Sequence, residues 1–151
     1  MAMFMGTYEH TLDEKGRLIL PATFRSKLAQ GSVTVPLDRC LAILPPEEFD
    51  RMATHLKAQV SQGRADLDHL RAFASLADEA VPDSQGRMRL AAHLRDLAGL
   101  GDRVVVAGVL ERIEVWDPAR WAAVFPSGPA KFVSSIVREY GLGPVGTEAG
   151  T

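Results

Sequence analysis

The chain has 151 residues, a formal net charge of -2 and a hydrophobic fraction of 46%, which is typical of one soluble globular protein with a core of its own. No apolar run approaches the roughly 20 residues that span a bilayer, and no charged and apolar leader opens the chain, so we expect a cytoplasmic protein without a membrane anchor. The single cysteine, Cys40, excludes an intramolecular disulfide and a cysteine-based zinc cage.

A tight turn between two short strands is predicted near the N-terminus. Asp13 and Gly16 bracket the residues DEKG, where Asp bonds the backbone ahead of it and Gly accepts a positive φ angle. Strand-forming residues at 7–12 precede this turn, and an apolar run at 18–20 follows it. Pro21 suits the first turn of a helix, because its missing N–H costs little there. The unit is therefore strand, turn, strand and short helix.

The middle of the chain is predicted to contain two strands followed by two amphipathic helices. Residues 32–35 and 40–44 are the expected strands, and residues 46–60 and about 65–77 are the expected helices. Between residues 45 and 79, acidic side chains outnumber basic ones by seven to four. We therefore do not expect a phosphate backbone to bind here, and we expect the helices to pack against the core or a neighbouring subunit.

The turn unit returns 70 residues later. Its spacing is repeated through the turn, the strand and the helix start, and most of the matched positions are identical. The matched pairs are Asp13 and Asp83, Lys15 and Gln85, Gly16 and Gly86, Arg17 and Arg87, Leu20 and Leu90, Ala22 and Ala92, Arg25 and Arg95, and Leu28 and Ala98. Such a repeat indicates tandem duplication.

The second unit is predicted to continue as the first one does. Residues 104–109 and 112–116 are expected strands, and Asp117 with Pro118 suits the start of a helix. Positions in this part match the first unit at an offset of 72, so the duplication extends into that helix. After it, a last helix is predicted at 130–140, and at least the final eight residues are expected to be mobile.

The first turn unit is basic although the whole chain is mildly acidic. Residues 15–28 contain four Lys or Arg side chains and no acid. Lys15 and Arg17 flank the tip glycine, from which they would project toward a phosphate backbone. For a single hairpin, solvated charges without a ligand would be the favoured interpretation. The repeat, together with the family resemblance described next, favours DNA contact.

These residues carry a resemblance to a known family. The segment DEKGRLILPATFR is similar to the D-x-K-G-R-x-x-x-P-x-x-x-R signature of MraZ, a bacterial transcriptional regulator built from two AbrB-like swapped-hairpin units. The D-x-x-G-R of the second unit also fits, and the resemblance covers roughly residues 3 to 125. Single AbrB-type antitoxins share one such unit.

The resemblance implies an α+β, β-rich fold. In it, tandem AbrB-like units (strand, turn, strand, short helix, strand pair) form an internal pseudo-dimeric swapped-hairpin barrel with peripheral helices. Leu18, Leu20, Leu90 and Val105 would be buried together in it. The expected domains are a first unit with its trailing helix at 3–60, a helical connector at 61–78, a second unit at 79–126, and a C-terminal helix with a flexible tail at 127–151.

The resemblance also implies a function. We expect a sequence-specific DNA-binding regulator of the division and cell-wall gene cluster, including its own promoter, that is cytoplasmic and nucleoid-associated. Its partner would be double-stranded DNA, bound at repeated boxes by the basic turns of a homo-oligomeric ring of eight to twelve subunits. Two alternatives stay open: a ring-forming protein-interaction scaffold, and an AbrB-type antitoxin whose tail from residue 128 wraps a toxin.

The candidate site residues belong to the two turn units. Asp13, Gly16, Asp83 and Gly86 are expected to form the turns, and Asp13 and Asp83 need no catalytic role for this. Arg25 and Arg95 either touch DNA or anchor the helix by pairing with a turn aspartate. Because Gln85 replaces Lys15, the first unit should dominate binding. The candidate DNA-binding residues are Lys15, Arg17, Arg25, Arg87 and Arg95.

Catalytic and metal-binding patterns are missing from the sequence. The four histidines, His10, His55, His69 and His93, lack the spacing of a zinc-binding helix. We find no G-x-S-x-G motif, P-loop or dinucleotide fingerprint. Cys40 falls in a predicted strand, where a buried thiol is usually inert. We therefore expect no enzyme, no cofactor and no metal.

Overall fold

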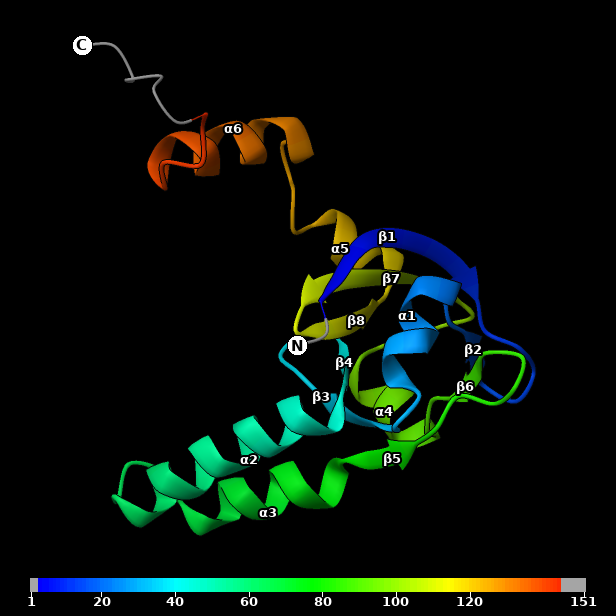
Figure 1. Ribbon diagram of the computed structural model, residues 1–151, viewed down its shortest axis with the longest axis vertical. Coiled ribbons are helices and arrows are strands. Elements are labelled where there is room, and N and C mark those ends of the chain that lie inside the picture. The colour runs from blue at the N-terminus through cyan, green and yellow to red at the C-terminus, as the bar shows by residue number, and fades with distance from the viewer. Residues whose placement is uncertain (1–2, 145–151) are drawn as a thin grey trace. The chain divides into compact units, whose positions relative to one another are not determined.

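The structure is a computed structural model that describes residues 3–144 (Figure 1). The chain divides into two compact units, one that runs to Pro118 and one that begins at Ala119. The mobility expected at the end of the chain concerns chiefly residues 145–151, which lie outside the described residues. The domain boundaries expected from the repeat stay predictions.

Most strands and helices lie close to the segments that the sequence predicts. The chain begins with β1 (Phe4–Thr11), β2 (Arg17–Ile19), α1 (Ala22–Arg25), a 3₁₀ turn (Ser26–Leu28), β3 (Ser32–Pro36), β4 (Leu41–Leu44), α2 (Pro46–Ser61) and α3 (Leu67–Leu76). The repeat follows with β5 (Asp78–Ala80), β6 (Arg87–Arg89), α4 (Ala92–Leu97), β7 (Arg103–Leu110), β8 (Arg112–Trp116) and α5 (Pro118–Ala122), and α6 (Pro129–Glu139) comes last.

The two repeats exchange strand partners. Six strands form an antiparallel sheet in the order β1-β7-β8-β4-β3-β5, and β2 pairs with β6 in a separate two-stranded ribbon. In this order, β1 of the first repeat pairs with β7 of the second, and β5 of the second pairs with β3 of the first. Each repeat therefore completes the sheet of the other.

The strand registers place a pseudo-twofold axis through two residue pairs. Leu18 lies opposite Met88 in the ribbon, and Ala42 lies opposite Glu114 where β4 meets β8. The two members of each pair occupy equivalent positions in the repeat, so the axis passes between them. The duplication seen in the sequence is therefore also a symmetry of the backbone.

The predicted α+β class is confirmed, but the described strands do not close into a barrel. Among residues 3–144, β1 and β5 are the edge strands of this sheet. These edge strands differ in length, because β1 has eight residues and β5 has three. The described strands thus form an open sheet with a ribbon beside it.

The main core lies between the sheet, the ribbon and helices α1 and α4. It contains Leu18, Leu20 and Leu90, as expected, together with Phe24 and Leu94 from the helices. The placement expected for Val105 was wrong. Val105 is buried, but its neighbours Val104 and Val106 line this core, because successive side chains of a strand point to opposite faces.

Helices α2 and α3 lie side by side (Figure 1) and cover the other face of β3 and β4. Val33, Val35, Ala42 and Leu44 form a second cluster with side chains of these helices. The rings of Phe49 and Phe73 stack with centroids 5.2 Å apart. The helical pair therefore packs on the core, which is one of the two placements expected from the sequence; the other was packing against a neighbouring subunit.

The smaller unit contains α6 and the residues before it. Phe125 makes edge-to-face contacts with Trp121 and Phe132, with ring centroids 5.6 and 5.4 Å away. The α6 helix begins one residue before the predicted start and ends one residue before the predicted end. Within residues 3–144, no helix is both long enough and apolar enough to span a bilayer.

Truncation of an inward-facing side chain of the ribbon should lower the free energy of unfolding far more than truncation of its outward neighbour. Leu18 is fully buried and Ile19 is 51% exposed. We expect Leu18→Ala to lower the free energy of unfolding by about 2–5 kcal/mol through lost burial and a cavity, and Ile19→Ala to change it by less than about 0.5 kcal/mol. Urea denaturation of both variants measures the difference, and equal losses would contradict the assigned faces.

Candidate nucleic-acid interface

Each predicted turn is closed by its aspartate. Asp13 Oδ1 accepts hydrogen bonds from the backbone N–H groups of Lys15 (2.9 Å) and Arg17 (2.8 Å). Gly16 N–H donates to the Asp13 carbonyl at 2.9 Å, and Gly16 has a φ of +71°. Only glycine adopts this conformation at little cost, so the identities of Asp and Gly follow from the turn.

The second turn has the same geometry. Asp83 Oδ1 accepts from Gln85 N–H and Arg87 N–H, both at 2.9 Å. Gly86 has a φ of +78°. Burial also repeats along the two units, since the turn residues are exposed except for the glycine. The two turns therefore present equivalent backbones with different side chains at the tip, Lys15 in one and Gln85 in the other.

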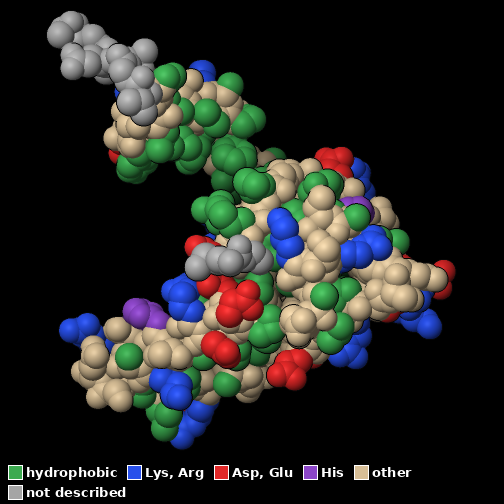
Figure 2. Space-filling view, viewed as in Figure 1, with side chains coloured by type: hydrophobic (Ala, Val, Ile, Leu, Met, Phe, Trp, Pro, Cys, Tyr) green, Lys and Arg blue, Asp and Glu red, His purple; other side chains and the backbone are tan. Residues whose placement is uncertain are grey.

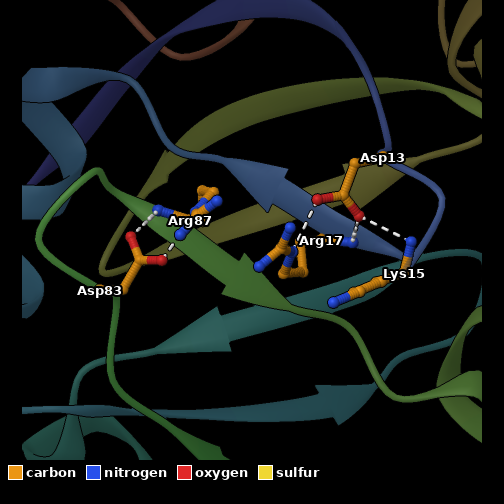
Figure 3. A network of polar contacts seen from close by, with 5 residues as sticks. All are labelled: Asp13, Lys15, Arg17, Asp83 and Arg87. Carbon is orange, nitrogen blue, oxygen red and sulfur yellow. Dashed lines mark hydrogen bonds and ion pairs between the residues drawn. The ribbon is translucent and has the colours of Figure 1, made fainter.

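The turn aspartates also bind an arginine. Asp13 Oδ2 accepts from Arg17 Nε at 2.6 Å, and Asp83 Oδ2 accepts from Arg87 Nε at 2.7 Å (Figure 3). The expected alternative, in which a turn aspartate pairs with Arg25 or Arg95, was therefore wrong. Among residues 3–144, the Arg17 guanidinium has no other bonded partner, so its two Nη groups remain available to a ligand.

These bonds shift the pKa of both aspartates. The backbone N–H of Arg17 is the largest cause of the lowered pKa of Asp13, and the backbone N–H of Arg87 is the largest cause of the lowered pKa of Asp83. The guanidinium groups add to this effect. Both carboxylates are ionised at neutral pH and hold Nε of the adjacent arginine in a fixed direction.

The ribbon has one apolar face and one basic face. Leu18 and Met88 point into the core. The residues on either side of them point outward, since side chains alternate along a strand. Three of these four are arginines: the exposed side-chain fraction is 31% for Arg17, 33% for Arg87 and 66% for Arg89. Figure 2 shows Lys and Arg side chains on the side of the molecule where Figure 1 places β2 and β6.

Like charges meet across the ribbon. Arg17 lies directly opposite Arg89 in the β2–β6 register, an arrangement that destabilises a strand pair. Arg89 also lies 3.5 Å from Asp78, measured from Nη2 to Oδ2. Each outward arginine is thus paired with a carboxylate, while part of its side chain stays exposed. A guanidinium that is held by a carboxylate at one edge still has further N–H groups that can donate to an anionic ligand.

Arg25 and Arg95 lie beneath the turns rather than on the basic face. Arg25 Nη2 donates to the Leu20 carbonyl at 3.1 Å, and Arg95 Nε donates to the Leu90 carbonyl at 3.0 Å. Their guanidinium groups cover the glycine of the opposite repeat: Arg25 covers Gly86 and Arg95 covers Gly16. Each repeat therefore holds the turn of the other.

Backbone bonds run beside these arginines. Leu20 N–H donates to the Gly86 carbonyl at 2.9 Å, and Leu90 N–H donates to the Gly16 carbonyl at 3.1 Å. We name the two sets of contacts the reciprocal clasp: Arg25 and Leu20 on Gly86, and Arg95 and Leu90 on Gly16. The clasp explains why the turn glycines are buried although their neighbours are exposed.

Arg89 and Ile19 are not among the site residues predicted from the sequence. Both occupy the basic face because of the β2–β6 register, and that register joins segments 70 residues apart. An alternating pattern in a three-residue strand is too short to show which face is outward. Their position could be found from the sequence only after the two repeats had been paired antiparallel.

A methyl group on Gly16 should disturb the reciprocal clasp. A Cβ there would lie 2.7 Å from Arg95 Cζ, whereas a Cβ on Gly63, which has nearly the same φ of +72°, would meet nothing within 4 Å. Both alanine variants are destabilised by the positive φ angle, so Gly63→Ala is a matched control. We expect Gly16→Ala to lower the free energy of unfolding by about 1 kcal/mol more than Gly63→Ala does. This is the typical net contribution of one hydrogen bond, which the displaced Arg95 side chain would lose.

Urea denaturation measures this difference. In an Arg95→Ala background the excess cost of Gly16→Ala should disappear, because no guanidinium remains above the glycine. An excess of the same size in both backgrounds would show that Arg95 does not press on this turn.

The turn aspartates should make stability fall in acid. The pKa values of both aspartates in the folded protein lie below the ordinary value of about 3.9. The ionised carboxylates therefore contribute fully to the free energy of unfolding above that pH, and this contribution is lost as the pH falls through the folded pKa. We expect the stability difference between wild type and the Asp13→Asn, Asp83→Asn variant to be constant from pH 7 to about 5 and to shrink below about pH 4. Denaturation curves at several pH values measure it.

Glu14→Gln is the control for this experiment, because it removes a carboxylate from the same turn and Glu14 is exposed. Because Asp13 and Asp83 are kept in this variant, its stability should still fall below about pH 4. A stability difference that is independent of pH down to pH 2 would contradict the role of the ionised aspartates.

The comparisons with known proteins agree with the duplicated architecture. The family described as "MraZ protein, putative antitoxin-like" matches residues 3–70 and again residues 73–127. A protein from Nocardioides sp. named transcriptional regulator MraZ is 45% identical over 130 residues, which is 85% of this chain and 90% of that protein.

Two further relatives carry the same name. The protein from Salinispora arenicola is 47% identical over 120 residues, 79% of this chain and 84% of the relative. The protein from Kocuria rhizophila is 43% identical over 131 residues, 86% of this chain and 92% of the relative. With both repeats matched and these identities over most of its length, the chain belongs to the MraZ family.

Proposed function

We propose that this protein is a transcriptional regulator that binds duplex DNA through the outward face of the β2–β6 ribbon and the two turns beside it. The observation that carries the proposal is the set of three outward arginines, Arg17, Arg87 and Arg89, on one two-stranded ribbon. The names of the relatives support the regulatory role.

The shape of the ribbon suits a DNA groove. A two-stranded antiparallel ribbon fits the major groove of B-DNA, where arginine Nη groups can reach base edges or phosphates. Asp13 and Asp83 hold Nε of Arg17 and Arg87, which leaves the far end of each guanidinium for the ligand. Because these orientations exist before binding, less side-chain entropy is lost when DNA arrives.

The two turns differ in charge. Lys15 is exposed at the first tip, and Gln85 takes its place at the second. The first turn therefore adds a phosphate contact that the second lacks, and we expect it to contribute more to affinity. In this proposal, Arg25 and Arg95 act through the reciprocal clasp, by holding the turns in place, rather than by contact with DNA.

Several copies would act together. One ribbon carries few cations, and the whole chain has a net charge of -2, so a single protomer should bind weakly. We propose that the protein forms a ring of eight to twelve subunits, each an internal pseudo-dimer of AbrB-like hairpins, and that the ring binds repeated boxes in its own promoter within the division and cell-wall gene cluster. Avidity would then supply the affinity, and the protein would be found at the nucleoid.

A protein-interaction role is the second candidate function. It is favoured by the apolar residues that α6 exposes, since Phe132 is 46% and Val133 is 50% exposed. Salt separates the two roles. DNA affinity falls steeply with salt because counterions are released, whereas an apolar protein interface changes little.

Removal of Arg17 should weaken DNA binding without affecting assembly. In a gel shift with the DNA upstream of this protein's own gene, we expect Arg17→Ala to lose about 1–3 kcal/mol, roughly 5- to 150-fold in affinity. The matched control is Arg71→Ala, which also removes an exposed arginine from an aspartate pair, here Asp68 on α3, and should bind as the wild type does.

Light scattering of the same samples reports the oligomeric state, which both variants should share. Equal affinities of wild type and Arg17→Ala would contradict the proposed site. Binding by the wild type that does not change between about 50 and 200 mM salt would favour the protein-interaction role instead.

A further inference from the structure

The basic face of the ribbon breaks its own symmetry at one pair of positions. Arg17 and Arg87 are equivalent in the two repeats and identical. Ile19 and Arg89 are also equivalent, but one is apolar and the other is charged. The pseudo-twofold axis passes between Leu18 and Met88, so within the ribbon the exchange of Ile for Arg distinguishes the two ends of this face. Lys15 and Gln85 add a second difference at the turn tips.

Ile19 is placed where a ligand of the arginines would also meet it. It is 51% exposed, and it lies directly opposite Arg87 in the strand register. Side chains at directly opposite positions are neighbours on one face. Ile19 therefore stands beside Arg87 on the outward face, so that a duplex bound along this face would meet both side chains.

Arg89 marks the other end of the face. It lies opposite Arg17 and is the most exposed of the three outward arginines, with 66% of its side chain accessible. This end carries two cations side by side, whereas the Ile19 end carries one cation and one apolar group. A symmetric duplex would meet two chemically different ends.

We propose, on the basis of the proposed function, that Ile19 and Arg89 are specificity-determining residues that give the ribbon a direction on DNA. Ile19 contacts the C5-methyl group of a thymine in the major groove, because that methyl is the apolar feature that the groove presents. Arg89 contributes an additional contact to a phosphate at the opposite end. The preferred site is therefore asymmetric although the backbone is nearly twofold symmetric.

The experiment selects binding sites from random duplex DNA with full-length wild type, Ile19→Ala and Arg89→Ala. We expect the wild-type sites to contain a thymine position that the Ile19→Ala sites lack. Replacement of that thymine by deoxyuridine removes only the methyl group and should weaken wild-type binding about three- to fourfold, as expected for one buried methyl. The same replacement should not change binding by Ile19→Ala.

Arg89→Ala serves as the matched variant at the equivalent position. It should keep the thymine preference and should reduce the slope of log affinity against log salt by about one, as expected for the loss of one phosphate contact. Urea denaturation of all three proteins should give similar stabilities, which confirms that neither variant acts by unfolding.

Failure of this inference can be told apart from failure of the proposed function. Identical site preferences of wild type and Ile19→Ala, or equal wild-type affinities for thymine and uracil DNA, would overturn the inference while DNA binding stands. A wild-type protein that enriches no sequence and binds no duplex would overturn the proposed function as well.

Discussion

The antiparallel pairing of β2 with β6 is the constraint on which the rest of the structure depends. It places Leu18 against Met88 in the core and, by alternation, turns the arginines outward. A two-stranded ribbon is marginal by itself, so its apolar face needs the sheet and helices behind it. The reciprocal clasp joins the ribbon ends to the opposite repeat. The packing that stabilises the fold therefore also produces the basic face.

The exchange of strands between repeats explains why two copies occur in one chain. Because β1 pairs with β7 and β5 pairs with β3, neither repeat can complete the sheet with its own strands. Duplication within one chain supplies the second repeat that each sheet needs. It also frees the two copies to differ, as they do at Lys15 and Gln85 and at Ile19 and Arg89. A dimer of identical chains could not carry such differences.

Each turn combines a rigid backbone with oriented charge. One carboxylate, on Asp13 or Asp83, accepts two backbone N–H groups and one arginine Nε. The backbone bonds are the main reason that the pKa of each carboxyl is lowered. The same ionised group thus shapes the turn and directs the arginine, so changes to it affect folding and the surface together.

The sequence by itself determined the local elements and the turn residues, because the interactions that favour a turn at Asp and Gly, or an apolar face of a helix or strand, extend over only a few residues. Comparison of its two halves also revealed the duplication. The sequence also placed Arg17 and Arg87 correctly beside the turns. Only the tertiary structure decided which strands pair, that Val105 faces away from the main core, that Arg25 and Arg95 hold the opposite turns, and that Ile19 and Arg89 share the basic face. The pairings of β1 with β7 and of β2 with β6 join segments that are far apart in the sequence. A continuous apolar run such as 104–109 does not reveal its inward side, since both of its faces are equally apolar.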